Sequence, residues 1–379
     1  MNRQGAVSSL IKRALPRKMY IRLRKSYIKK HSLKPSVDDL MFLLEDKRID
    51  QELRRMVKSF VSHDVEKYLS KFWLQMAQNH VQKLLERGYE NFKQTIAVEY
   101  FTFAQESDQV QPNFLKRMLP QEVVKESEEK SKRINPHVYF SQEQSRYYNL
   151  LTILLWEYAK WQVKPEILNT LEEPLVGNPP VIKHDGRLIS QDIANSALEY
   201  QSITEGLKGS ELSSVMEVGA GYGRVAYVFL TLHPSIRYFI VDIPPALYIS
   251  QRYLSEAFPN KRIFRFKDFK SYKLVQQEIE AADIIFLIPH QLSLLPEKMA
   301  DLFVAINCLN EMTSSIRTLY FNYVNRLTRS FYFKCHKVAD TPYEGRVTEQ
   351  DYPMLSHWRK IYWRNCNVQQ HFFEAFYSI

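Results

Sequence analysis

The sequence predicts an α/β protein in which a doubly wound parallel sheet follows a helical N-terminal region. From Ser213 to Cys335, short apolar runs alternate with segments of helical periodicity, which is typical of parallel strands joined by helices. Before this part, apolar residues recur at helical spacing over much of 36–205. The last two candidate strands, 360–366 and 372–378, are too close together for a helical crossover. They therefore predict an antiparallel hairpin at the edge of the sheet.

The expected elements define three regions: a basic tail over 1–35, a helical region over 36–205 and a strand–helix domain over 206–379. In the helical region, the charged segment 119–135 is expected to be a linker, and the Pro- and Gly-containing segment 172–180 must be a loop. The helices expected there cover 37–61, 65–85, 141–160 and 190–207. The strands expected in the last domain are 215–218, 238–242, 284–288, 302–306 and 330–335, with helices over 222–232, 246–258 and 314–327.

The composition is that of a soluble globular protein. Of 379 residues, 45% are hydrophobic and 25% charged, which suits one large domain or two ordinary ones. The most apolar stretch, 147–161, is too short and too often interrupted by polar residues to span a bilayer, and the N-terminus lacks the apolar core of a secretory signal. The cysteines Cys308, Cys335 and Cys366 are odd in number and far apart, so they predict neither a disulfide framework nor a zinc site. We expect a cytoplasmic protein.

The positive charge is concentrated at the N-terminus. The net charge is +10, and residues 1–35 hold eleven Lys and Arg and no acidic residue, which leaves the rest of the chain near neutral. Apolar residues are interleaved with these cations, as in segments that lie on an anionic membrane surface or bind a partner protein. Peripheral association with the inner membrane surface would follow. A solvated basic arm without a specific partner is the alternative.

A glycine-rich motif lies where the first strand turns into a helix. Residues 217–224 read Glu-Val-Gly-Ala-Gly-Tyr-Gly-Arg. The glycines, which are Gly219, Gly221 and Gly223, let the backbone turn tightly and approach a ligand to which the helix-terminal amides point. A dinucleotide-binding G-x-G-x-x-G motif would need glycine where Arg224 stands. The pattern E/D-x-G-x-G-x-G of methyltransferases that use S-adenosylmethionine fits at every fixed position from Glu217 to Gly223.

Asp242 supports this interpretation of the motif. It follows Gly223 by nineteen residues and ends the second strand. A carboxylate in this place accepts hydrogen bonds from both ribose hydroxyls and repels a 2′-phosphate. Ile243 would then flank the adenine, and Glu217 would face the positively charged methionyl end of the cofactor, directly or through water. A glycine turn and an aspartate cap without a ligand are the alternative.

Further segments carry a resemblance to a known family. They are 217–227, 242–247, 251–254, 289–292 and 301–312, with 173–179 and 193–200 upstream. With these segments the sequence resembles a bacterial family of sugar O-methyltransferases within the class I superfamily, over about residues 135–379. Where that family has an aromatic residue and Gln before Glu-Met, this chain has Leu309 and Asn310, which bears on acceptor contacts rather than on the cofactor site.

The resemblance implies a Rossmann-like class I methyltransferase, that is, a transferase with S-adenosyl-L-methionine as cofactor. Its acceptor would be a sugar hydroxyl in the biosynthesis of a surface polysaccharide such as O-antigen, either on a nucleotide-sugar or on a lipid-linked glycan.

Methyl transfer to a hydroxyl requires a residue that removes the proton while oxygen, methyl and sulfur stay collinear. In a doubly wound sheet, such residues lie at the carboxyl ends of the strands. Glu311, after the fourth strand, is the first candidate for the base, with a carboxylate at the start of the following helix as the alternative. His290, after the third strand, is the second candidate, with a contact to the adenine or an ordinary loop imidazole as the alternatives. Asn307, next to the fourth strand, is expected to contact the cofactor.

Two other residues are candidates for cofactor contacts. Gln291 would reach the adenine amine, and Tyr200 would contact the cofactor carboxylate from a helix over the pocket, although a helix-packing tyrosine fits Tyr200 equally well. Some sugar methyltransferases use a divalent metal, so a metal stays possible here, but no Asp, His and Glu residues show ligand-like spacing along this sequence to support one.

Two other functions compete with this interpretation. A nucleic-acid methyltransferase guided by the basic tail is disfavoured, because nucleic-acid proteins usually carry a basic face and the body of this chain is near neutral. Enzymes that methylate amino groups also tend to have the motif N/D-P-P-aromatic after the fourth strand. This chain has Asn-Cys-Leu-Asn at the corresponding residues 307–310, which does not match that motif. An inactive cofactor-binding scaffold of a glycan assembly complex remains open, since the motif argues for binding and not for chemistry.

Overall fold

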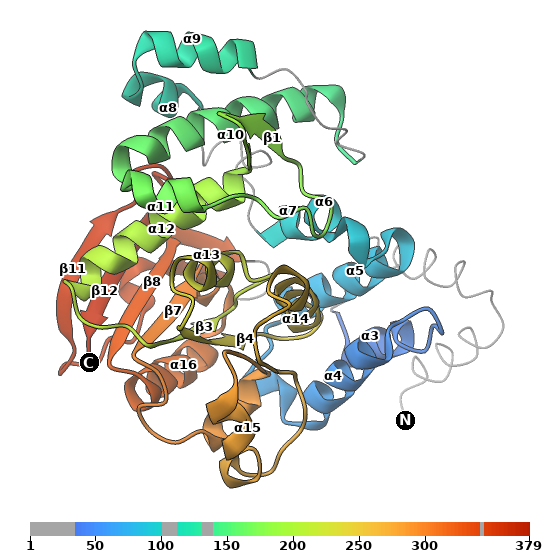
Figure 1. The fold of residues 1–379 in the computed structure, drawn as a ribbon. Helices are drawn as coiled ribbons and strands as arrows, with labels where there is room; N and C mark the ends of the chain where they lie inside the picture. The colour runs from blue at the N-terminus through green and yellow to red at the C-terminus, as the bar shows by residue number, and fades with distance from the viewer. Residues whose placement is uncertain (1–34, 101–111, 131–138, 342–344) are drawn as a thin grey trace.

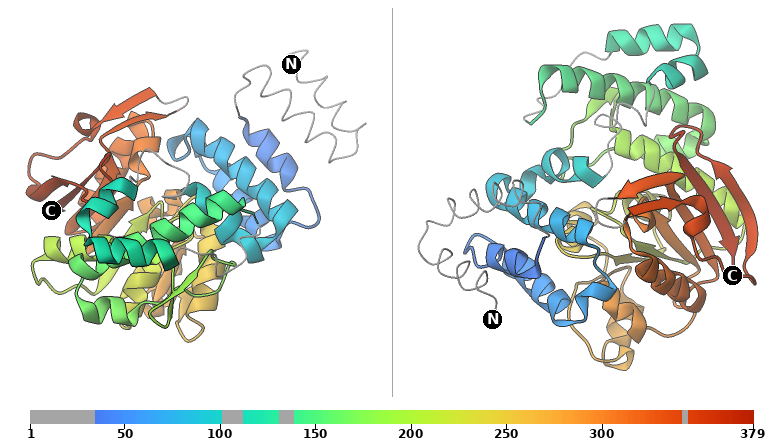
Figure 2. Two further views of the ribbon diagram at one scale, coloured as in Figure 1. Left: turned by 90° about the horizontal axis from the view of Figure 1, so that it is seen from above. Right: turned by 180° about the vertical axis from the view of Figure 1, so that it is seen from behind.

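The computed structural model describes residues 35–100, 112–130, 139–341 and 345–379 (Figure 1). The basic tail expected over 1–35 lies outside these ranges except for its last residue, so its proposed partners stay predictions. Within the described ranges, helices lead into a large mixed sheet, and the N-terminal helices lie on the opposite side of the molecule from the C-terminal strands (Figure 2). No helix of this part of the chain combines the length and the apolar character that crossing a membrane requires.

The N-terminal part is helical, as the apolar periodicity predicts. Its α-helices are α3 (Val37–Leu43), α4 (Gln51–Ser62), α5 (Lys71–Arg87), α6 (Phe92–Thr95), α7 (Ala97–Tyr100), α8 (Pro112–Met118), α9 (Gln121–Lys130), α10 (Gln142–Gln162), α11 (Pro165–Thr170) and α12 (Gln191–Leu207). Side-chain oxygens of Ser36, Asp50, Ser70, Ser141 and Ser190 cap α3, α4, α5, α10 and α12 by accepting first-turn N–H groups. These caps fix where the longer helices begin.

Three details of the helical region differ from the prediction. The single helix expected over 37–61 is divided into α3 and α4, with Asp50 starting the second helix. The helix expected from 65 begins at Lys71, after a short 3-10 turn. The segment 119–135 is not merely a linker, because it contains α9, which packs against α10. Its charged residues are good helix formers that face solvent, while Val123, Val124 and Ser127 face inward.

The central sheet has eight strands in the order β11-β12-β8-β7-β3-β4-β6-β5. The strands are β3 (Ser214–Val218), β4 (Arg237–Val241), β5 (Ile263–Phe264), β6 (Ile284–Leu287), β7 (Leu302–Ile306), β8 (Ser330–His336), β11 (Arg359–Asn365) and β12 (Phe372–Ser378). Strands β5, β6, β4, β3, β7 and β8 pair in parallel. Strand β12 is antiparallel to β8 and to β11, which confirms the edge hairpin. Two short antiparallel pairs lie outside this sheet: β1 (Ile182–His184) with β2 (Arg187–Ile189), and β9 (Val338–Thr341) with β10 (Gly345–Thr348).

Helices cover both faces of the sheet, as a doubly wound fold requires (Figure 1). They are α13 (Arg224–Leu232), α14 (Ala246–Ala257), α15 (Gln276–Ala281) and α16 (Ser314–Leu327). Successive residues of a strand point to opposite faces. Val215 and Ile240 accordingly belong to a buried cluster with α12, α13, α14 and the N-terminal helices, whereas Met216 and Phe239 belong to a second cluster with α16.

The N-terminal helices reach the carboxyl ends of the strands. Gln251 of α14 donates to Glu52 of α4 at 2.6 Å, and the hydroxyl of Tyr68 lies 3.5 Å from that of Tyr323 in α16. The helices also share one buried cluster with the sheet, to which Phe60, Leu154 and Ile203 belong together with Tyr238 and Val304. This packing places residues 68–73 over the strand ends, where the site lies.

Candidate active site

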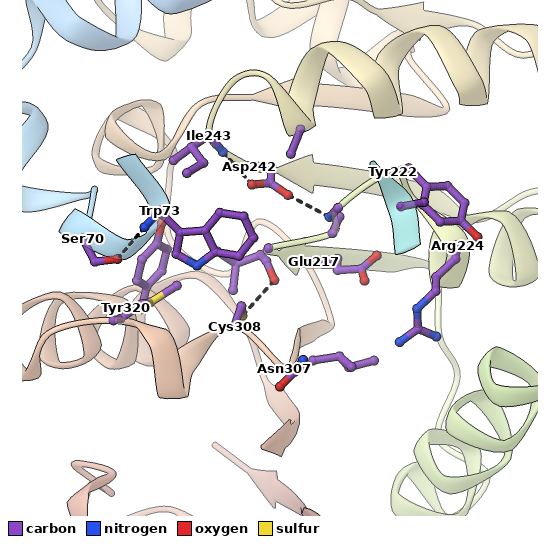
Figure 3. Close-up of a pocket in the computed structure, with 18 of the residues that line it drawn as sticks. Ser70, Trp73, Glu217, Tyr222, Arg224, Asp242, Ile243, Asn307, Cys308 and Tyr320 are labelled. Atoms are coloured by element: carbon purple, nitrogen blue, oxygen red, sulfur yellow. Dashed lines mark hydrogen bonds between the residues drawn. The ribbon is translucent and has the colours of Figure 1, made fainter. Parts of the chain in front are cut away.

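A cavity opens at the carboxyl ends of β3, β4 and β7 (Figure 3). One wall consists of the glycine-rich turn after β3, residues 242–243 after β4 and residues 306–308 after β7. The opposite wall comes from elsewhere in the chain and includes Tyr68, Ser70, Trp73, Met312 and Tyr320. The cavity therefore lies where a doubly wound sheet is expected to bind its ligand.

The turn after β3 depends on its glycines. Gly219, Gly221 and Gly223 have φ angles of 66°, 60° and 91°, a left-handed region that side chains disfavour. A Cβ on Gly219 would lie only 2.5 Å from the Cβ of Cys308, which also lines the cavity. The backbone conformation of the turn therefore requires these glycines, and the backbone of the turn lines the cavity.

Asp242 lies directly against this turn and is bonded to it (Figure 3). Its Oδ2 accepts the N–H of Gly221 at 2.8 Å, and its Oδ1 accepts the N–H of Ile243 at 2.7 Å. Burial raises the pKa of Asp242 to about 7, although the two backbone hydrogen bonds act in the opposite direction. The carboxylate is therefore held at the end of β4, and Ile243 lines the cavity beside it.

Glu217 also lines the cavity, but its carboxyl group is deeply buried. Tyr238 donates to its Oε2 at 2.8 Å. Burial raises the pKa of Glu217 to about 8, against the lowering effects of Tyr238 and Arg224. Burial therefore disfavours the charged form of this carboxyl group.

Arg224, the last residue of the motif, ties the turn to α12. Its guanidinium donates to Ser196 Oγ at 2.7 Å and pairs with Glu199, and Lys334 of β8 donates to the same carboxylate at 2.9 Å. Burial on its own would raise the pKa of Glu199, but Arg224 and Lys334 outweigh it and lower that pKa to about 2. The buried carboxylate of Glu199 thus pairs with two cations and links α12 to the glycine turn and to β8.

Asn307 has the left-handed backbone of a residue held by its surroundings, with φ of 52°. Its N–H donates to the carbonyl oxygen of Lys334 at 2.7 Å. Its side-chain Oδ1 is buried at the cavity and accepts no hydrogen bond from any residue the structure describes. A buried acceptor without a partner fits a ligand that donates a hydrogen bond there.

Two expected cofactor contacts are engaged elsewhere. The amide of Gln291 accepts the N–H of Ile288 at 3.0 Å and donates to the carbonyl of Lys267 at 2.9 Å. The hydroxyl of Tyr200 lies 2.6 Å from His233 Nε2. Neither side chain is among those that line the cavity, so the structure does not support either contact, and both stay predictions.

The two candidate bases also lie outside the cavity lining. His290 stacks on His63 from the end of α4, and burial, followed by His63, lowers its pKa to about 4. Glu311 ends a short 3-10 turn, while α16 begins at Ser314 and is capped by Thr313. The structure therefore supports neither the catalytic role of Glu311 nor its alternative place at the start of the helix.

A group with metal-ligand chemistry lies away from the cavity. Within the described ranges, Glu157, His184 and Asp185 bring their ligand atoms within 4.8 Å of one another. Sequence spacing did not reveal it, because α10 and the β1–β2 pair meet only in space. Lys160 contacts both carboxylates and supplies a positive charge there, so we assign no metal to this group.

Sequence reasoning missed part of the cavity wall. The missed residues are Tyr68, Ser70, Trp73, Asp192, Met312 and Tyr320. Arg224 was recognised only as a residue that excludes a dinucleotide motif. Trp73 falls in the helix expected over 65–85, and nothing in a single sequence indicates that this helix meets the glycine turn. Asp192 stands in the first turn of an expected helix, where an acidic residue is common for reasons of helix stability alone.

No protein-family model matches the sequence, and no curated protein matches it. Solved structures similar to parts of the fold include an S-adenosylmethionine-dependent methyltransferase from Clostridium acetobutylicum, with 10% identity over 48% of this chain and 90% of that one and a TM-score of 0.32. The N-methyltransferase NodS from Bradyrhizobium japonicum, solved with S-adenosyl-L-homocysteine, has 15% identity over 47% of this chain and 84% of its own, with a TM-score of 0.31. The glycopeptide N-methyltransferase MtfA has 12% identity over 50% and 90%, with a TM-score of 0.34. Similarity this weak identifies no substrate.

Proposed function

We propose that the chain is a methyltransferase that uses S-adenosyl-L-methionine and transfers the methyl group to a sugar hydroxyl. The observation that carries the proposal is Asp242, held at the end of β4 against the glycine turn, where both line one cavity. In this arrangement Asp242 would hold the ribose, the backbone of Gly219 and Gly221 would approach the ligand closely, and Ile243 would flank the adenine. The bound cofactor supplies a methyl group made electrophilic by the sulfonium.

The residues present fit such a ligand. The close contact between Gly219 and Cys308 leaves no room for a side chain on the turn, and the Oδ1 of Asn307 is a buried acceptor that still needs a donor. Both features favour a ligand rich in hydrogen-bond donors that approaches the backbone. We propose that residues 206–379 bind the cofactor and that the helical region shapes the acceptor side.

The wall opposite the turn supports an uncharged acceptor. Tyr68, Trp73 and Tyr320 contribute aromatic rings, and Ser70 contributes a hydroxyl. Aromatic surfaces with a few hydroxyl groups suit the C–H faces and hydroxyls of a sugar ring. Together with the family resemblance, this supports a sugar in a surface polysaccharide, on a nucleotide-sugar or a lipid-linked glycan whose charged part lies outside the cavity.

Incubation with cofactor carrying a labelled methyl group tests the proposal directly. The protein would be offered nucleotide-sugars, lipid-linked and free glycans, and RNA, and the product that gains label would be identified by mass spectrometry. Label in a sugar hydroxyl supports the proposal. Label in RNA alone refutes the sugar assignment, and cofactor binding without label in any acceptor favours the inactive scaffold.

A further inference from the structure

Three carboxyl groups line the cavity: Asp192, Glu217 and Asp242. The amino-acid end of the proposed cofactor carries an ammonium and a carboxylate group. An ammonium that leaves water for a cavity needs an ionised carboxylate beside it. Which of the three supplies this charge therefore determines how that end is bound.

Two of the three are poorly suited to the ammonium. Glu217 is deeply buried, its burial disfavours the charged form, and its Oε2 accepts the hydroxyl of Tyr238. Asp242 already accepts one backbone N–H on each oxygen, and its place at the end of β4 is that of the ribose ligand.

Asp192 differs from both. It is the second residue of α12, and its Oδ2 accepts the hydroxyl of Tyr222, the residue after Gly221, at 2.6 Å. Its Oδ1 accepts no hydrogen bond from the described residues, and Asp192 lines the cavity. Burial, followed by Glu173, raises the pKa of Asp192 to about 6, with Tyr222 and Arg224 acting against them. Asp192 is therefore mostly ionised at neutral pH.

Asp192 and Arg224 form a pair of opposite charges at one end of the cavity. Each shifts the pKa of the other, and both line the cavity. Figure 3 shows Arg224, Tyr222 and Glu217 on the side away from Ile243 and Trp73. If the nucleoside lies at Asp242 and Ile243, its amino-acid end extends toward this pair.

We propose that Asp192 binds the ammonium group of the cofactor and that Arg224 faces the cofactor carboxylate. The inference rests on the proposed function and refines it. The contact with the positively charged end of the cofactor, which the sequence predicts for Glu217, is thereby assigned to Asp192 in the helical region. The cofactor site is then built by α12 together with the sheet, and α12 recognises the part of the ligand that distinguishes S-adenosylmethionine from a simple nucleoside.

Two ligands test this assignment by calorimetry on the full chain. S-adenosyl-L-homocysteine carries the amino-acid end, whereas 5′-methylthioadenosine keeps the nucleoside and the sulfur but lacks that end. Asp192→Asn removes the charge with little change in shape. We expect it to weaken the binding of S-adenosyl-L-homocysteine by about tenfold or more and that of 5′-methylthioadenosine by less than about twofold. Asp340→Asn, in the exposed part of β9, is the matched control and should change neither affinity.

The outcomes separate the two proposals. If the unmodified protein binds neither ligand, the proposed function fails, and this inference fails with it. If it binds both, but Asp192→Asn weakens both equally or neither, the inference alone is overturned. Should Asp192→Asn fail to fold by circular dichroism, Tyr222→Phe decides instead. It removes the hydroxyl that orients Asp192, and a selective loss for S-adenosyl-L-homocysteine supports the assignment, whereas an equal loss for both ligands overturns it.

Discussion

The imidazole of His63 lies flat on that of His290, with ring centroids 3.7 Å apart and planes 13° apart. The stack joins the end of α4 to the turn after β6, two segments that are distant in the sequence. Within it, Nδ1 of His290 is buried and bonded to no residue in the described part of the chain. A charge on the His290 ring would be unfavourable there, because that ring is buried and lies against His63.

This contact predicts loss of stability in acid. Burial, followed by His63, lowers the pKa of His290 from 6.5 to about 4, so the unfolded chain binds more protons between these values. The stability contributed by neutral His290 is complete above about pH 6.5 and falls as the pH drops toward 4, by about 3 kcal/mol at most. Urea unfolding at pH 7 and pH 5 would measure it. His290→Phe should flatten this dependence, whereas His357→Gln at an exposed position should leave it unchanged.

Replacing Asp242 by alanine tests the ribose contact. We expect S-adenosyl-L-homocysteine to bind about 2 kcal/mol more weakly by calorimetry, because two charge-assisted hydrogen bonds are lost. Since the pKa of Asp242 is raised to about 7, the affinity of the unmodified protein should increase as the pH rises from about 6 to 8. Asp242→Asn should lose this increase. Full affinity in the alanine variant would show that the carboxylate does not hold the ligand.

Gly219→Ala should destabilise the protein by about 3 kcal/mol and abolish binding of S-adenosyl-L-homocysteine. The added Cβ combines a left-handed backbone with a 2.5 Å approach to Cys308. Gly209→Ala provides a matched control, because Gly209 has φ of 81° but no atom within 4 Å of the place that its Cβ would take. Thermal unfolding of both variants separates backbone strain from the clash. Equal losses of stability in the two variants would mean that Cys308 moves aside to make room for the added Cβ.

Glu199→Gln should reduce the free energy of unfolding by about 3–5 kcal/mol, since it leaves Arg224 and Lys334 buried without their shared counter-charge. Glu278→Gln removes an exposed pair with Lys267 and should cost less than about 1 kcal/mol. Urea unfolding of both variants gives the comparison. A cost for Glu199→Gln as small as that of the exposed pair would contradict the role given to this carboxylate.

Removing residues 1–35 should abolish binding to vesicles of anionic lipid and leave methyl transfer to soluble acceptors unchanged, because the basic residues of the tail supply the attraction. Co-sedimentation with anionic and with neutral vesicles measures the first effect. Vesicle binding that survives the truncation would rule out the tail as the membrane contact.

The sheet could be predicted well because its signals are local. The alternation of apolar runs and helices located the strands β3, β4, β6, β7 and β8 within one or two residues, and the short distance between the last two strands predicted their antiparallel pairing. Gly219 and Asp242 were found in the same way, since strand ends that are close in a parallel sheet bring their residues together. The helical region was less predictable. Charged α9 was taken for a linker because composition does not distinguish a solvated helix from a loop.

The remaining parts of the site depend on contacts between distant segments. Trp73 reaches the cavity because α5 packs over the strand ends, and His290 is removed from it because its ring meets His63. Gln291 was a reasonable adenine ligand by position, but its amide satisfies the backbone of its own turn. The spacing of residues in a single sequence does not predict any of these contacts.

The single buried cluster that joins the N-terminal helices to one face of the sheet has a consequence for evolution and for engineering. A fragment that starts at residue 206 would lack α12, which packs on α13, β8 and β12, and would leave Arg224 and Lys334 without Glu199. Exchanging the helical region for that of another enzyme, in order to change the acceptor, would require a new apolar surface matched to the sheet. Acceptor preference in this protein is therefore expected to change by substitutions along the cavity wall rather than by replacement of whole segments.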